Sequence, residues 1–167
     1  MPKGLVIGIG NRQRGDDGAG CAVADRLLAG PHPGFDIVSS DGDVARLMEW
    51  FRDYDPILIV DAAACARRAG PLQWNAAQAP LPAERRWASS HAMGLAEAIE
   101  LGRALGRLPR RLTVYGVPAR EFGWQEGLSP LTARAVERTA ARIEREWRRG
   151  LTEAPAETPA IHARSGA

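Results

Sequence analysis

The chain has 167 residues, of which 45% are hydrophobic and 25% charged, so wholesale disorder is excluded and one domain with its own core is expected. Its 22 basic and 20 acidic residues give a net charge of +2, which is too balanced to indicate binding to nucleic acid or to a membrane surface. Met1 leads into an apolar run without a charged leader or a long hydrophobic stretch, and we therefore expect a cytoplasmic protein.

The segment 5–20, LVIGIGNRQRGDDGAG, predicts a strand, a glycine-bearing loop and the start of a helix. Its glycines do not complete a nucleotide-binding motif. Asp16 and Asp17 stand where a phosphate-binding loop needs Lys and Ser or Thr, and Gln13 stands at the third glycine of the dinucleotide fingerprint. Two carboxylates would suit a cation instead. The alternative is that one of them only caps the helix that follows.

Strands and helices alternate along the rest of the chain. Apolar patterns and turn residues predict further strands at 35–39, 57–60 and 112–117, a weak edge strand at 70–74, and helices that begin near Ala19, Asp43, Ser89 and Ser129. This order predicts a doubly wound, mostly parallel sheet between two helical layers. We assign residues 1–150 to a single domain and expect 151–167, which lack periodicity, to be a disordered tail.

Three residues in this pattern could carry chemistry. Asp17 follows the first strand, Asp61 ends the apolar run 57–60, and His91 falls in the first turn of the helix predicted from Ser89. All three belong to the carboxyl-terminal edge of the strands, where open α/β sheets bind ligands. Two carboxylates and one imidazole leave coordination positions open, unlike a closed structural zinc site, and would accept zinc, nickel, iron or cobalt. Taken singly, each residue has a plainer explanation as a turn former, a cap or a surface group.

The cysteines and histidines indicate no covalent route to catalysis. Cys21 and Cys65 make neither a zinc motif nor a CxxC pair, and we expect both to be small buried side chains. The chain has three histidines, and they give no recognisable Ser-His-Asp or Cys-His set. We therefore expect neither a serine nor a cysteine nucleophile.

Four segments together resemble a known family. They are GIGNRQRGDDGAG at 8–20, ILIVDA at 57–62, SSHAMGLAEAIELGRALG at 89–106 and VYGVPAREFGWQEGLSP at 114–130. This combination resembles the hydrogenase maturation proteases, endopeptidases that remove the C-terminal extension from the large-subunit precursor of nickel-iron hydrogenases. The resemblance implies a three-layer α/β/α fold whose twisted, mostly parallel, five-stranded mixed sheet has one antiparallel strand, for which 70–74 is the candidate.

The resemblance also implies a site and a partner. The family's two acidic metal ligands fall on Asp17 and Asp61 and its histidine ligand on His91, and these three residues would be both metal-binding and catalytic. Nickel would arrive with the substrate, so no organic cofactor is expected, and the partner would be the large-subunit precursor. The family's Asp-Gly-Gly turn after the second strand reads Asp41-Gly42-Asp43 here. A nickel chaperone that does not cleave and a nucleotide-binding regulator remain alternatives.

Overall fold

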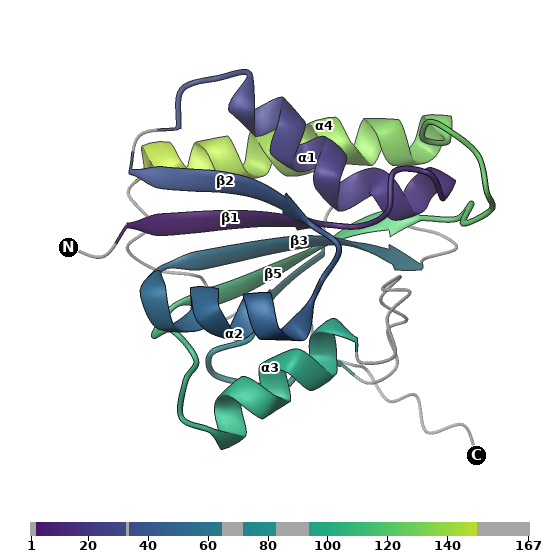
Figure 1. Ribbon diagram of the computed structural model, residues 1–167. Coiled ribbons are helices and arrows are strands. Elements are labelled where there is room, and N and C mark those ends of the chain that lie inside the picture. The colour runs from purple at the N-terminus through teal and green to yellow at the C-terminus, as the bar shows by residue number, and fades with distance from the viewer. Residues whose placement is uncertain (1–2, 33, 65–71, 83–93, 150–167) are drawn as a thin grey trace, which may run out of the picture.

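The sheet of the computed structural model has five strands in the order β2-β1-β3-β5-β4 (Figure 1). The structure describes residues 3–32, 34–64, 72–82 and 94–149. The strands are β1 (Gly4–Ile9), β2 (Phe35–Ser40), β3 (Ile57–Ala64), β4 (Leu72–Asn75) and β5 (Leu112–Ala119). All neighbouring pairs are parallel except β4 and β5, which are antiparallel. The predicted mixed sheet is confirmed, and its antiparallel strand comes from the predicted segment 70–74.

Helices cover both faces of this sheet, which gives the expected three layers. They are the 3-10 helix η1 (Gly15–Gly18), α1 (Ala19–Leu28), α2 (Val44–Asp53), α3 (Leu95–Ala104) and α4 (Pro130–Arg148). Helices α1 and α4 lie on one face, and α2 and α3 lie on the other (Figure 1). Among the described residues, no helix is both long enough and apolar enough to span a membrane.

Alternation along the strands builds one hydrophobic core on each face. In β3, Ile57 and Ile59 pack in the core beneath α2 and α3, whereas Leu58 and Val60 pack in the core beneath α1 and α4. By the same alternation, Asp61 belongs to the face that α2 and α3 cover. Both cores are fully buried, as expected for a sheet with helices on each side.

Two predicted helix starts are confirmed by their caps. The Asp43 carboxylate accepts a hydrogen bond from the Arg46 amide at 2.9 Å and so begins α2. The Ser129 hydroxyl accepts one from the Thr132 amide, and Pro130 occupies the first helical position of α4.

The third predicted helix, α3, begins at Leu95 in the structure. Its cap, Gly94, has extended backbone (φ −79°, ψ 176°). The predicted helical turn at Ser89 and the place of His91 in it stay predictions. Residues 83–93, and with them His91, are outside the described residues, as are Cys65 and the predicted tail 151–167.

Strand β3 is also longer than predicted. The apolar run stops at Asp61, but the strand continues to Ala64 because β5 pairs with it up to Ala119. The pairing between β1 and β3 ends earlier, at Gly8 and Val60. Asp61 is thus the first residue of β3 beyond the end of that pairing.

Candidate active site

Asp17 reaches the sheet edge because glycines turn the chain tightly after β1. Gly10 has a φ of 153°, and a Cβ at this position would lie 1.9 Å from the Asp17 carbonyl oxygen, so no other residue fits there. Gly20 allows a second close approach, since its Cβ would lie 2.3 Å from the Val60 carbonyl oxygen. The backbone at the start of α1 consequently lies against β3, one residue from Asp61. Asp17 itself is 1% exposed.

Asp61 is fully buried and has few hydrogen bonds. Its Oδ1 accepts one from the Ala62 amide at 2.8 Å, while its Oδ2 has no hydrogen-bond partner among the described residues. Burial raises the pKa of Asp61 to about 8, the negative charge of Asp17 adds to this rise, and the Ala62 amide opposes it. The charge of Asp17 is thus near enough to act on the ionisation of Asp61.

Asp16 has a different role from its neighbour. Its carboxylate accepts hydrogen bonds from the amides of Arg120, Glu121 and Ser129 and from the hydroxyls of Ser129 and Thr132, at 2.7 to 3.0 Å. Burial acts to raise the pKa of Asp16, but these donors outweigh it and the pKa is lowered. Asp16 thus joins η1 to the loop between β5 and α4.

The alternative that Asp16 or Asp17 only caps the following helix is wrong. The cap of α1 is Gly18, and no side chain makes a capping hydrogen bond there. Both aspartates lie within the 3-10 helix η1, before the start of α1, and the Asp16 carboxylate accepts hydrogen bonds from donors in a distant part of the chain. Sequence reasoning did not find Ser129 and Thr132 as partners of Asp16, because nothing in the local pattern links them.

A polar hollow of about 530 Å³ opens beside Asp17, at the ends of β1 and β2. It is lined by Ile9, Gly10, Asn11, Arg12, Gln13, Asp17, Cys21, Ser39, Ser40 and Asp41. The turn that follows β2 contributes Asp41, Gly42 takes a φ of 89°, and Asp43 caps α2. Asp43, which stands where the resemblance implies a glycine, thus serves as a helix cap.

Cys21 is buried at the base of this hollow, as predicted. Its thiol lies 3.5 Å from the carbonyl oxygens of Gly8 and Gly10, toward which it can donate. Burial raises the pKa of Cys21, which keeps the thiol protonated and makes it a poor nucleophile. The environment of Cys21 agrees with a packing role.

The described residues supply two of the three predicted metal ligands. Across residues 3–32, 34–64, 72–82 and 94–149, no group of three or more His, Cys, Asp or Glu side chains is placed to hold a metal ion. Cys21 therefore does not complete a metal site with Asp17 and Asp61. His91 as the third ligand stays a prediction.

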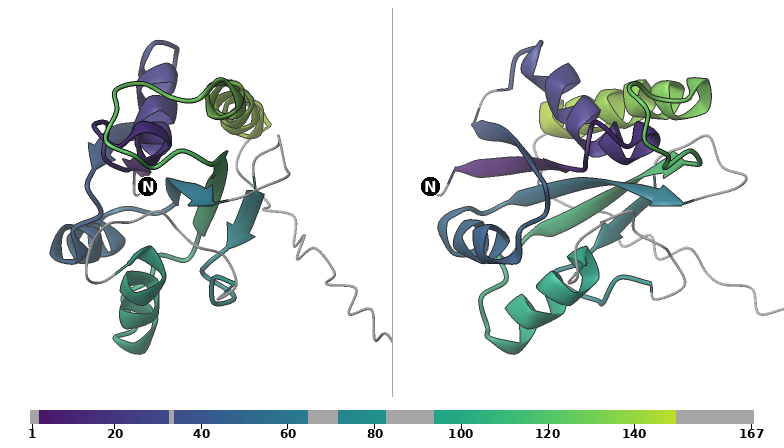
Figure 2. Two further views of the ribbon diagram at one scale, coloured as in Figure 1. Left: turned by 90° about the vertical axis from the view of Figure 1, so that its right-hand side faces the viewer. Right: turned by 45° about the vertical axis from the view of Figure 1, so that its right-hand side comes forward.

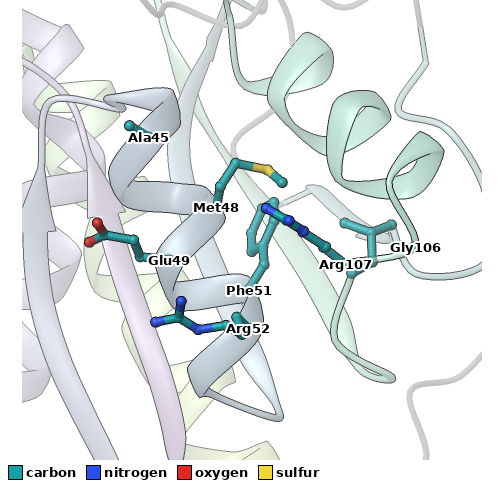
Figure 3. A pocket seen from close by; sticks show the side chains of 8 residues that line it. Ala45, Met48, Glu49, Phe51, Arg52, Gly106 and Arg107 are labelled. Atoms are coloured by element: carbon teal, nitrogen blue, oxygen red, sulfur yellow. The ribbon is translucent and has the colours of Figure 1, made fainter.

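A second hollow, of about 510 Å³, lies between α2 and the segment that follows α3 (Figure 3). It is lined by Ala45, Met48, Glu49, Phe51, Arg52, Gly106, Arg107 and Leu108. It shares no residue with the hollow beside Asp17, and neither Asp17 nor Asp61 borders it. Of the two hollows, Asp17 borders the one at the strand ends, which is therefore the candidate active site; Asp61 is fully buried and is not among the residues that line it.

Comparisons with known proteins agree with this fold. The family model of hydrogenase maturation proteases of the HycI type matches residues 35–146. Two solved structures with similar folds are HybD from Thermococcus kodakarensis and the endopeptidase HybD from E. coli. The first is 23% identical over 86% of this chain and 97% of that chain, with a TM-score of 0.68. The second is 21% identical over 89% of this chain and 94% of that chain, with a TM-score of 0.71. A third similar structure is HycI from T. kodakarensis KOD1, which is 23% identical over 86% of this chain and 91% of that chain, with a TM-score of 0.62. No curated protein sequence matches the chain.

Proposed function

The chain belongs to the hydrogenase maturation protease family, and we propose that it recognises its substrate through nickel that Asp17 and Asp61 bind. The substrate is the large-subunit precursor of a nickel-iron hydrogenase, from which the enzyme removes the C-terminal extension. The nickel arrives in the precursor and is part of the substrate. The observation that carries this proposal is the buried pair of carboxylates at the strand ends.

The state of Asp61 supports binding of a cation. Its Oδ2 is buried without a hydrogen bond from the described residues, and the nearby charge of Asp17 makes ionisation still less favourable. A divalent cation between the two carboxylates would offset both costs, and Asp61 would release its proton as the cation binds. Two carboxylates with an imidazole from His91 form a modest site with open coordination positions, which suits a metal that remains attached to the substrate.

The chain's own residues bear on which nucleophile attacks the scissile carbonyl. With a pKa of about 8 while no cation is bound, Asp61 holds a proton at neutral pH and releases it when the cation binds. The protonated Cys21 thiol argues against a thioester intermediate. We therefore assign the attack on the scissile carbonyl to water. Bound nickel would supply either polarisation of this carbonyl or only a recognition contact.

Cleavage of two forms of the precursor tests this proposal. Metal-stripped enzyme is incubated with nickel-loaded and with nickel-free precursor, and the mass of the large subunit is measured. We expect loss of the extension from the loaded form alone, and no cleavage by the variant Asp61→Asn. Equal cleavage of both forms would refute nickel recognition, and unchanged mass of both would favour a nickel chaperone.

A further inference from the structure

Trp124 lies in the loop between β5 and α4 and is 79% exposed. The other exposed large hydrophobic side chains among the described residues are Leu28, Leu101 and Leu105, none of them above 53%. Tryptophan is on average one of the more buried residues, because leaving its large ring in water is costly. A ring this exposed indicates a binding role if it lies close to a functional site.

The position of Trp124 is next to the candidate active site. Its loop is hydrogen-bonded along the loop that carries the aspartates: the Gly15 amide donates to the Gln125 carbonyl at 2.9 Å, and the Gln125 amide donates to the Gln13 carbonyl at 3.1 Å. The Asp16 amide donates to the Glu121 carbonyl at 2.8 Å. The two loops lie side by side at the carboxyl-terminal ends of the strands in both views of Figure 2.

The ring also has a neighbour on the loop that carries the aspartates. The guanidinium of Arg14 lies 5.9 Å from the centre of the Trp124 ring, and an Arg14 nitrogen lies 3.5 Å from the Phe122 carbonyl oxygen. The Asp17 amide donates to the Arg14 carbonyl at 3.2 Å, so Arg14 links the ring to the candidate site. A ring that already packs against a neighbouring side chain has less conformational entropy to lose when a partner covers it.

We propose that Trp124 is a docking anchor for the large-subunit precursor, against which an apolar side chain of the precursor packs close to the cleavage point. This inference rests on the proposed function, because the precursor is the partner that must reach Asp17 and Asp61. A small molecule would need a concave site, and Trp124 lines neither hollow. Protein partners, in contrast, often bind through single Trp and Arg side chains. The charge of Arg14 beside the ring disfavours a cationic side chain as the contact.

Replacing the ring tests the proposal by separating binding from catalysis. We expect Trp124→Ala to raise the Kd for nickel-free precursor and the KM for nickel-loaded precursor by about tenfold or more, with kcat changed by less than about twofold. Trp124→Phe should restore part of the affinity because it keeps an aromatic face. The melting temperature should stay the same, since an exposed ring contributes little to folding.

Leu105→Ala is the matched control. Leu105 is 53% exposed and caps the end of α3. It comes shortly before the start of β5 and therefore lies at the amino-terminal ends of the strands, opposite to the candidate active site. Its truncation should leave Kd and KM unchanged. An unchanged Kd for Trp124→Ala, or an equal rise in both variants, would overturn the anchor. The titration with nickel-free precursor needs no cleavage. If both precursor forms are cut equally, nickel recognition fails while the Kd ratio still decides the role of Trp124.

Discussion

Asp16 and Asp61 are both fully buried at the same edge of the sheet, yet their pKa values move in opposite directions. Asp16 accepts five hydrogen bonds, three from backbone amides and two from hydroxyls, and its pKa is lowered. Asp61 accepts one, from the Ala62 amide, and its pKa is raised to about 8. Burial alone therefore does not distinguish the two carboxylates, and the number of donors around each one does.

This difference separates a carboxylate that stabilises the fold from one that is available for chemistry. The charge on Asp16 is already compensated, and its hydrogen bonds hold the loop that carries Trp124 against η1. A negative charge on Asp61 would be uncompensated in the described structure. Burial of Asp61 is therefore favourable only when the carboxyl group is protonated or when a cation compensates its charge. The following substitutions test this distinction.

Asp16→Asn should cause the largest change in stability. The asparagine side chain has one oxygen and would present an NH2 group to donors, so several buried donors would lose their acceptor. We expect the free energy of unfolding at pH 7 to fall by about 2 to 4 kcal/mol. Because the folded-state pKa of Asp16 is lowered, its stabilisation is present above the usual value of 3.8 and is lost as the pH falls through the folded pKa. Urea unfolding at pH 7 and at pH 3 should show a large difference from the parent that shrinks in acid.

Asp61→Asn should have the opposite effect on stability while removing activity. The amide can keep the hydrogen bond from Ala62 and has no charge to bury. With a folded pKa of about 8, the contribution of Asp61 to stability is fully present below pH 3.8 and is lost as the pH rises toward 8. We expect the variant to be more stable than the parent by about 1 to 3 kcal/mol at pH 8 and nearly equal to it at pH 4. Thermal unfolding across this range measures the effect, and a variant less stable at pH 8 would contradict it.

Thr132→Val should have a smaller effect than the change at Asp16. It removes one hydroxyl, which lies 2.8 Å from the Asp16 carboxylate, and leaves the donors from Arg120, Glu121 and Ser129 in place. We expect a loss of about 1 kcal/mol in the free energy of unfolding, with precursor cleavage retained. A loss as large as that of Asp16→Asn would show that the five hydrogen bonds are formed or lost together.

The sequence predicted the sheet, its helices and the position of Asp17 and Asp61 because these depend on local patterns and on the parallel topology. It could not separate Asp16 from Asp17. The two are neighbours with identical side chains, and the donors that distinguish them come from Arg120, Ser129 and other residues more than 100 positions later. Nor did the sequence predict that α3 begins at Leu95, because a lone glycine such as Gly94 gives no local sign that it takes an extended backbone and caps the helix.

Asp17→Asn should produce the smallest change and tests whether the two carboxylates act as a pair. The charge of Asp17 raises the pKa of Asp61, although burial is the larger cause. We therefore expect the pKa of Asp61 to fall in this variant but to stay well above 3.8, which can be followed by NMR of its carboxyl carbon. Asp41→Asn is the control, because Asp41 borders the same hollow but does not contribute to the shift at Asp61. If Asp17→Asn and Asp41→Asn give the same pKa, Asp17 and Asp61 are too weakly coupled to share one cation, and the proposed nickel contact would need a different pair of ligands.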